Sequence, residues 1–230
     1  MLPLQWQHLT ARTRSCTIAF ILPALTSDLA SIDLDYSRVS ENASCAAIIE
    51  SYETLLSRGV SFGPVSLVNL GKCYIACDRP SMAVPLFKKA IEIQPCDSSP
   101  FFHLAIAFCR LKDFVAARAA CLKAIEIKPS HPDLLCLLGQ IEADSSGSED
   151  AALALYEEAL SIDKCCYPGL LNAGNIYSLI GEDDRAEQYF ARALEASPGS
   201  LDARYNMGRL CHMQGRLREA LQRYDDVLSM

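Results

Sequence analysis

Apolar residues recur at spacings of three and four along most of the chain, in stretches of roughly a dozen residues. That spacing places apolar side chains along one face of an α-helix. From residue 64 onward the stretches come in pairs joined by short turns. The pattern predicts an all-α protein built from helix pairs.

Small and large residues also repeat with a period of 34. The first set is Gly71, Tyr74, Ala83, Phe87, Ala90 and Pro95. The residues of similar bulk 34 positions later are Ala105, Phe108, Ala117, Cys121, Ala124 and Pro129. The period continues through Gly139, Gly174 and Gly208, provided one extra residue is allowed in the loop SSGSED. We therefore predict five units, at 64–97, 98–131, 132–166, 167–200 and 201–230.

The order of sizes has a physical reason. Gly or Ala lets the backbones of two helices approach closely, and the large residue fills the space beside the crossing. One helix pair cannot bury its apolar face alone, whereas stacked neighbours can, so stability comes from nearest-neighbour interfaces.

A period of 34 with these small, aromatic and proline positions resembles the tetratricopeptide repeat (TPR) family. The resemblance covers residues 64–230 and implies a right-handed superhelical solenoid of antiparallel helix pairs. The third unit departs from it, because Lys164 replaces the terminal proline. The Trp that opens the family's unit is replaced by Leu67, Phe101, Leu135, Leu170 and Arg204.

Two local features refine the helix ends. Pro85 removes a backbone hydrogen bond and crowds Ser81, so the helix that contains it should start late or kink. Ser146 and Glu149 have the spacing of a helix capping box, although serines followed by acids also suit an acid-directed kinase.

The N-terminal part has a different pattern. Residues 1–30 hold Arg12 and Arg14 before the apolar stretch CTIAFILPAL, a layout similar to that of a targeting segment. Residues 31–63 form a degenerate leading repeat or helical cap, since Ile48, Tyr52 and Leu55 trace one helical face. A cytoplasmic location is expected, with an organelle or the secretory route as the alternative. Only in that route would the sequon Asn42-Ala43-Ser44 be glycosylated.

Composition excludes several function classes. The net charge is −7, and nucleic-acid binding needs clustered Lys and Arg. No run of 18 apolar residues indicates a membrane span. The chain has neither the glycine-rich phosphate-binding patterns nor the HExxH and nucleophile-elbow motifs, so we expect no enzyme and no cofactor.

The chain has 11 cysteines, including Cys73 and Cys77 one helical turn apart and the adjacent pair Cys165 and Cys166. A zinc or redox site is one interpretation. Because no CxxC pair occurs, packing as small apolar residues is the alternative that we favour. An odd number also argues against a fully paired disulfide framework and favours a reducing compartment.

Function is expected on the concave side, which the first helix of each unit lines in such arrays. The sixth positions of the units hold Asn69, His103, Leu137, Asn172 and Asn206. In the family that this chain resembles, an Asn here often binds the backbone of an extended peptide, because an amide is both donor and acceptor. A solvated helix-surface amide is the alternative.

Neighbouring positions add charge and apolar surface to this predicted peptide-binding site. Its full set is Asn69, Lys72, His103, Arg110, Gln140, Asn172, Asn175, Asn206 and Arg209. Asp133, Asp144 and Asp202 balance the charge, and Phe102, Ile106, Leu137, Leu171 and Tyr205 are apolar. Such a surface suits a segment of another protein. We therefore predict a protein-interaction scaffold or adaptor, part of a larger assembly.

Two alternatives remain. A TPR co-chaperone would bind the acidic tail of a chaperone through a carboxylate clamp, of which Asn175 and Asn206 match two positions while Leu171 replaces a Lys. The repeat arm of an O-linked N-acetylglucosamine transferase would also carry an Asn ladder, but would need a catalytic half beyond these 230 residues.

The last unit predicts a second interface. Leu217, Leu221, Tyr224 and Leu228 are spaced as one apolar stripe, and arrays of this kind usually end in a polar capping helix. We expect the stripe to contact another copy or a partner, or the chain to belong to a longer protein.

Overall fold

The computed structural model describes residues 45–228, which form eleven α-helices in two compact units, Met1–Asp113 and Phe114–Met230. The targeting segment and the sequon predicted above lie outside the described residues. Unit 1 contains α2 (Cys45–Ser57), α3 (Pro64–Ala76), α4 (Pro80–Ile93) and α5 (Ser98–Arg110). Unit 2 contains α6 (Phe114–Ile127), α7 (Pro132–Ser146), α8 (Glu149–Ile162), α9 (Tyr167–Leu179), α10 (Asp183–Ala196), α11 (Leu201–Met213) and α12 (Leu217–Leu228).

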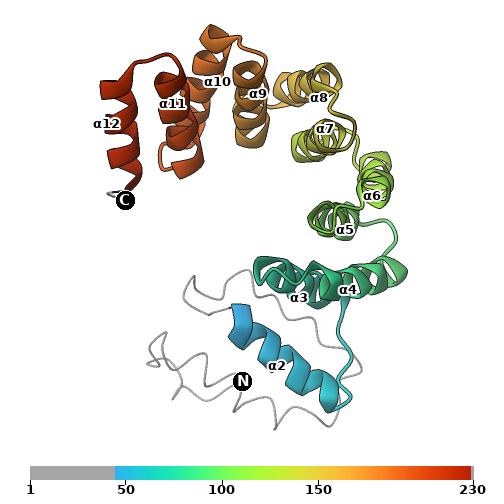
Figure 1. The fold of residues 1–230 in the computed structure, drawn as a ribbon. Helices are drawn as coiled ribbons and strands as arrows, with labels where there is room; N and C mark the ends of the chain where they lie inside the picture. Colours follow the sequence, from blue (N-terminus) through green and yellow to red (C-terminus); the bar gives the residue numbers. More distant parts are fainter. Residues whose placement is uncertain (1–44, 229–230) are drawn as a thin grey trace, which may run out of the picture. The chain divides into compact units, whose positions relative to one another are not determined.

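Within each unit every helix packs against the next one along the chain (Figure 1). The first helices of successive pairs also contact one another, α3 with α5 in unit 1, and α7 with α9 and α9 with α11 in unit 2. We call α3, α5, α7, α9 and α11 the A helices and their partners the B helices. The predicted all-α solenoid of helix pairs is confirmed.

Size complementarity sets the crossing of each described Gly-containing pair. A Cβ built on Gly174 of α9 would lie 2.7 Å from the ring of Phe190 of α10, which is fully buried. Gly139 and Tyr156 repeat this contact between α7 and α8 at the same 2.7 Å. The glycines are therefore required by the ring that lies against the A-helix backbone.

The turn between the two helices of a pair uses a left-handed backbone. Gly181, between α9 and α10, has a φ of 80°. Lys112 has a φ of 59° at the equivalent position, where a residue with a Cβ is strained. The other residues at this position are Asp78, Gly147 and Gly215, all with positive φ.

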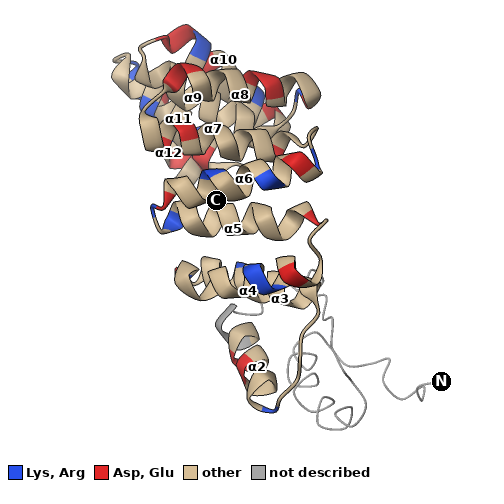
Figure 2. Ribbon diagram, turned by 90° about the vertical axis from the view of Figure 1, so that its right-hand side faces the viewer, with Lys and Arg blue, Asp and Glu red and all other residues tan. Residues whose placement is uncertain are grey.

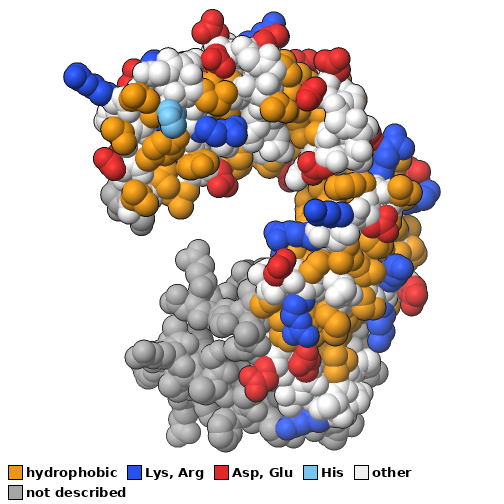
Figure 3. Space-filling model, in the orientation of Figure 1, with side chains coloured by type: hydrophobic (Ala, Val, Ile, Leu, Met, Phe, Trp, Pro, Cys, Tyr) orange, Lys and Arg blue, Asp and Glu red, His pale blue; other side chains and the backbone are white. Residues whose placement is uncertain are grey.

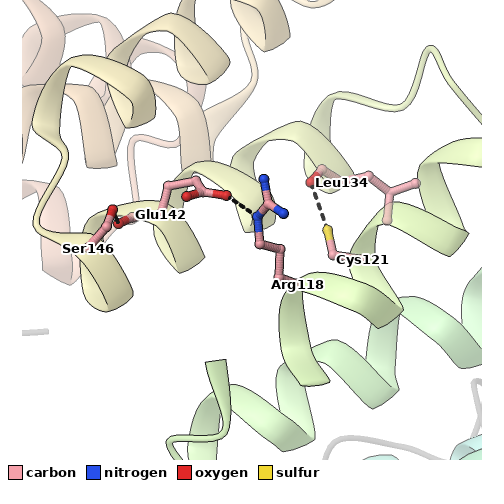
Figure 4. Close-up of polar contacts among 5 residues, drawn as sticks. All are labelled: Arg118, Cys121, Leu134, Glu142 and Ser146. Atoms are coloured by element: carbon pink, nitrogen blue, oxygen red, sulfur yellow. Dashed lines mark hydrogen bonds and ion pairs between the residues drawn. The ribbon is translucent and has the colours of Figure 1, made fainter. Parts of the chain in front are cut away.

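Polar contacts join neighbouring pairs in unit 2 (Figure 4). Arg118 Nε on α6 donates to Glu142 Oε1 on α7 over 2.6 Å. The Cys121 thiol donates to the Leu134 carbonyl oxygen over 3.4 Å inside the core. The ion pair lies at the surface, where solvent screens it, so it contributes little stability.

One prediction about helix ends is wrong, and another is wrong in part. The α4 helix begins at Pro80 and runs through Pro85, so it does not start late, and a kink at Pro85 stays a prediction. The fixed φ of Pro80 suits the first turn of a helix. Pro85 has no N–H to donate to the Ser81 carbonyl, but Ser81 is exposed, so that carbonyl can accept a hydrogen bond from water. Ser146 is not a cap: its hydroxyl donates to the Glu142 carbonyl over 2.7 Å, because α7 extends through Ser146 and Ser148 precedes α8.

Candidate protein-interaction surface

The A helices of unit 2 present four equivalent pairs of residues on α9 and α11. These are Leu171 with Tyr205, Asn172 with Asn206, Asn175 with Arg209, and Leu179 with Met213. Each pair is 34 residues apart, and the members on one helix are spaced by one, three and four residues, so they share a face. We call these eight residues the unit 2 A face.

Apolar side chains lie on both sides of the amides on this face. Leu179 is 73% exposed, Met213 62% and Tyr205 53%, and Leu171 is half-buried. Exposed apolar groups that adjoin polar ones are typical of surfaces that bind proteins. The unit 2 A face therefore combines apolar anchor positions with hydrogen-bonding groups.

The three Asn side chains differ in whether they already form hydrogen bonds within the fold. Asn172 is half-buried and hydrogen-bonds the Tyr156 side chain. Burial raises the pKa of Tyr156, and this hydrogen bond lowers it in part. The side chain of Asn206, also half-buried, makes no hydrogen bond within residues 45–228. Asn175 Oδ1 is shielded from solvent and lacks a donor in the same part of the chain. Asn206 is thus the amide most available to a ligand.

Tyr205 is held in place by its neighbour on α12. Its ring lies 5.7 Å from that of Tyr224, in a tilted arrangement that is favourable for aromatic pairs. Tyr224 also packs over Gly208, where an added Cβ would lie 2.8 Å from its ring. An anchor residue whose rotamer is already fixed loses less entropy when it binds.

The third A helix of unit 2 contributes less than expected. Leu137 on α7 is only 8% exposed and belongs to the core, so it does not line an open surface. Cys136 and Leu138 beside it are buried as well, because α6, α8 and α9 all pack against α7. Gln140 on the same helix is exposed, as a ligand-binding residue must be.

In unit 1 the expected site residues take other roles. His103 on α5 stacks on Phe87 of α4, with ring centroids 5.8 Å apart. Burial, and then the charge of Lys72, lower the pKa of His103 to about 4, so the imidazole is neutral at pH 7. Arg110 lies 3.9 Å from Asp78 in an exposed ion pair. Asn69 is half-buried on α3 and has an interaction of its own.

Acidic and basic residues are interspersed along the helices (Figure 2). Among residues 45–228, no group of three or more His, Cys, Asp or Glu side chains could hold a metal ion. None of the described helices is long and apolar enough to cross a membrane.

The stripe on α12 is exposed apart from one residue. Leu217, Leu221 and Leu228 are exposed, with Leu228 at 84%, and Figure 3 shows hydrophobic side chains gathered over α11 and α12. Leu160, at the equivalent position of α8, is only 8% exposed because α9 covers it. Tyr224 differs from the expectation, since it packs against α11 at the aromatic position of the repeat.

Leu179 and Met213 were not among the predicted site residues, although a signal was available. They lie four residues after Asn175 and Arg209, one helical turn further along the same face. Following the period of 34 to the end of each A helix would have identified both.

Models of one protein family match the chain in two separate ranges. Models of the tetratricopeptide repeat match residues 65–95 and 181–229. A thermophilic TPR protein of Thermus thermophilus superposes with a TM-score of 0.66 at 23% identity, over 73% of this chain and 91% of that one. This similarity supports the fold.

Two mouse proteins are similar in sequence. Interferon-induced protein with tetratricopeptide repeats 2 is 33% identical over 147 residues, which are 62% of this chain and 30% of that protein. Protein O-mannosyl-transferase TMTC1 is 28% identical over 104 residues, 44% of this chain and 11% of that protein. The chain thus spans less than a third of either relative. With its 34-residue period, its helix pairs and these matches, the chain contains tetratricopeptide repeats, a family whose members generally mediate protein–protein interactions.

Proposed function

We propose that the unit 2 A face binds an extended or helical segment of a partner protein, so that the chain acts as a scaffold or adaptor in a larger assembly. The observation that carries the proposal is the order of residues across α9 and α11: apolar, amide, polar, apolar. Apolar anchors of the partner would pack on Tyr205, Leu179 and Met213.

The amides would set the register of the bound segment. Asn206 offers a donor and an acceptor whatever the side chains of the ligand are, so it can pair with a peptide backbone. Asn172 would add a second such contact 34 residues earlier, with part of its capacity already used by Tyr156. Arg209 is exposed and favours a partner with an acidic residue near this point.

Photo-crosslinking tests this proposal while the partner is still unidentified. Benzoylphenylalanine in place of Tyr205 should crosslink the full chain to a defined protein in cells. The same group at exposed Gln188 on α10 should not. The substitution Asn206→Ala should reduce the Tyr205-site product, and Gln222→Ala should leave it unchanged. Equal crosslinking from positions 205 and 188 would contradict the proposal.

The co-chaperone alternative rests on Asn175 and Asn206, which match two positions of a carboxylate clamp. Half-buried Leu171 stands where that clamp needs a Lys, so a free C-terminal carboxylate would lose an ion pair. A chaperone-like acidic peptide should therefore bind equally well with a free or an amidated terminus. Calorimetry that shows tight binding only with the free carboxylate would establish the co-chaperone function instead.

We also propose that Leu217, Leu221 and Leu228 form a contact surface between copies of the chain. The contrast between exposed Leu228 and Leu160 favours this, because the position that Leu228 holds on α12 is covered by the next helix at Leu160 of α8. Light scattering should detect self-association, and Leu221→Lys with Leu228→Lys should abolish it. A monomer at high concentration before any substitution would refute this contact.

A further inference from the structure

Two buried thiols lie in contact inside unit 2. Cys136 is on α7 and Cys166 is the N-cap residue of α9, and their Sγ atoms are 3.6 Å apart. The side chains are only 2% and 4% exposed, and both thiols are free. They come from segments 30 residues apart in sequence, so the repeat packing alone brings them together.

The surroundings hold the two sulfurs against each other. A Cβ on Gly169 would lie 3.2 Å from Cys136 Sγ, so the α9 backbone closes one side. The Cys166 N–H donates to the Asp163 carbonyl over 3.0 Å, which fixes the turn before α9. A disulfide bond has a sulfur–sulfur length of about 2.05 Å, so the two atoms need to move about 1.5 Å closer to reach bonding distance.

We propose that Cys136 and Cys166 are an oxidative modification site that forms a reversible intramolecular disulfide on reaction with a peroxide. The proposal is independent of the partner-binding function above. Simple packing of two small apolar residues would account for their burial. It would not require the two sulfurs to be in direct contact.

The chemistry proceeds in two steps. The Cys166 sulfur attacks one peroxide oxygen, the O–O bond breaks, and the leaving hydroxide takes the thiol proton to give water and a sulfenic acid. The Cys136 sulfur then attacks the Cys166 sulfur, the S–O bond breaks, and the second proton leaves with the hydroxyl as water. Two thiols and one hydrogen peroxide thus give one disulfide and two waters, and the thiols lose two electrons.

The fold suggests which sulfur reacts first. Cys166 lies at the start of α9 and directly follows the exposed Cys165. Burial raises the pKa of the Cys136 thiol, so that group is poorly suited to the first attack. Cys136 is suited to the second attack, on the Cys166 sulfur. Because the two sulfurs are already in contact, a far smaller thiolate fraction is enough than for a thiol in solution.

The disulfide would link α7 to the start of α9, two A helices that already touch. A covalent link across a loop of this size restricts the unfolded chain. We expect the unfolding midpoint of the oxidised protein to rise by roughly 5 °C.

The test uses the full chain and hydrogen peroxide. After treatment, the remaining thiols are alkylated under denaturing conditions, and the monomer fraction is digested and analysed by tandem mass spectrometry. The expected product is a cross-linked peptide that joins Cys136 to Cys166 and that dithiothreitol separates. Cys165→Ser should keep this product and the rise in unfolding midpoint, whereas Cys166→Ser should lose both.

Three results would overturn the proposal. The first is recovery of Cys136 and Cys166 as alkylated thiols while exposed Cys96 and Cys165 are oxidised. The second is a link from Cys136 to Cys165 instead. The third is loss of the cross-link in Cys165→Ser. Mapping of the unsubstituted protein decides the first two even if a variant fails to fold.

Discussion

The A helices of the two units share one register and use it differently. In unit 1 the sixth position of α5 is His103, which stacks on Phe87 and is neutral at pH 7. In unit 2 the sixth positions of α9 and α11 are both Asn, and Asn206 has no hydrogen-bond partner in the described chain. The same helix position therefore serves packing on α5 and presents an amide on α9 and α11, whereas Asn69 holds it on α3 and the core residue Leu137 on α7.

The turns between paired helices differ between the units as well. Unit 2 places Gly147, Gly181 and Gly215 where the backbone is left-handed, and unit 1 places Asp78 and Lys112 there. Glycine takes this conformation without a steric cost, whereas a residue with a Cβ is strained. Unit 2 is thus better matched to the repeat geometry at its turns, and it is also the unit that carries the proposed binding face.

The largest expected effect comes from removing the support of the unit 2 A face. Phe190→Ala deletes a fully buried ring beside Gly174 and should destabilise unit 2 by about 3 to 5 kcal/mol. Urea denaturation followed by circular dichroism measures this. Val115→Ala, at a position 84% exposed on α6, is the control and should change stability by less than about 0.5 kcal/mol.

A smaller loss should follow from enlarging the glycine instead of deleting the ring. Gly174→Ala places a Cβ 2.7 Å from the Phe190 ring and should cost about 1 to 3 kcal/mol. Adding Phe190→Leu should recover part of this loss, since the smaller side chain leaves room. A double-mutant cycle measures the coupling. Strict additivity of the two substitutions would show that ring contact does not explain the glycine.

The neutral His103 predicts acid sensitivity in unit 1. Its pKa is about 4 in the fold and about 6.5 when unfolded, so the unfolded chain binds the extra proton between these values. The stability that His103 contributes should be fully present above pH 6.5 and should fall by about 2 kcal/mol towards pH 4. This is less than the whole pKa shift implies, because part of the ring is in contact with solvent.

His103→Asn sharpens this comparison, because it gives α5 the amide found on α9 and α11. The variant should lose the stack on Phe87 and therefore be less stable at pH 7. It should also lose this share of the acid sensitivity, which unfolding curves between pH 4 and 7 would reveal. An unchanged pH dependence would mean that His103 is not the titrating group.

The smallest effect concerns the turns. Lys112→Gly should stabilise unit 1 by about 0.5 to 1 kcal/mol, because the strain of a left-handed Lys exceeds the entropy that glycine adds to the unfolded chain. The matched control is the reverse change in unit 2, Gly181→Lys, which should destabilise by a similar amount. Thermal unfolding gives both values.

Much of the fold follows from the sequence because the repeat sets both size and spacing. Gly174 and Phe190 were paired by the period alone, and the structure places one over the other. Helix ends were less predictable, since they depend on backbone conformations that one residue can shift. Gly147 takes a left-handed φ that lets α7 include Ser146, so the spacing of a capping box at Ser146 and Glu149 had no effect.

The candidate surface was harder to predict, because the period locates a face without saying how deeply each residue lies. Leu137 and Asn172 hold equivalent positions, yet Leu137 is in the core and Asn172 is half-buried. The contact between Cys136 and Cys166 was also missed. The two residues are 30 positions apart, on α7 and at the start of α9. The repeat of 34 pairs equivalent positions of successive units, so it does not predict this contact.

The most direct test of the central claim is the affinity of the partner identified at Tyr205 for two variants, compared with the unsubstituted chain. Isothermal calorimetry should show that Asn172→Ala with Asn206→Ala weakens binding by about 1 to 3 kcal/mol, roughly 5- to 150-fold. The measurement is made well below the unfolding midpoint, which should fall because Tyr156 loses its hydrogen bond to Asn172. Asn69→Ala, the same position in unit 1, should leave the affinity within about twofold of the original. Unchanged affinity in the double variant, or an equal loss in Asn69→Ala, would contradict the assignment of partner binding to unit 2.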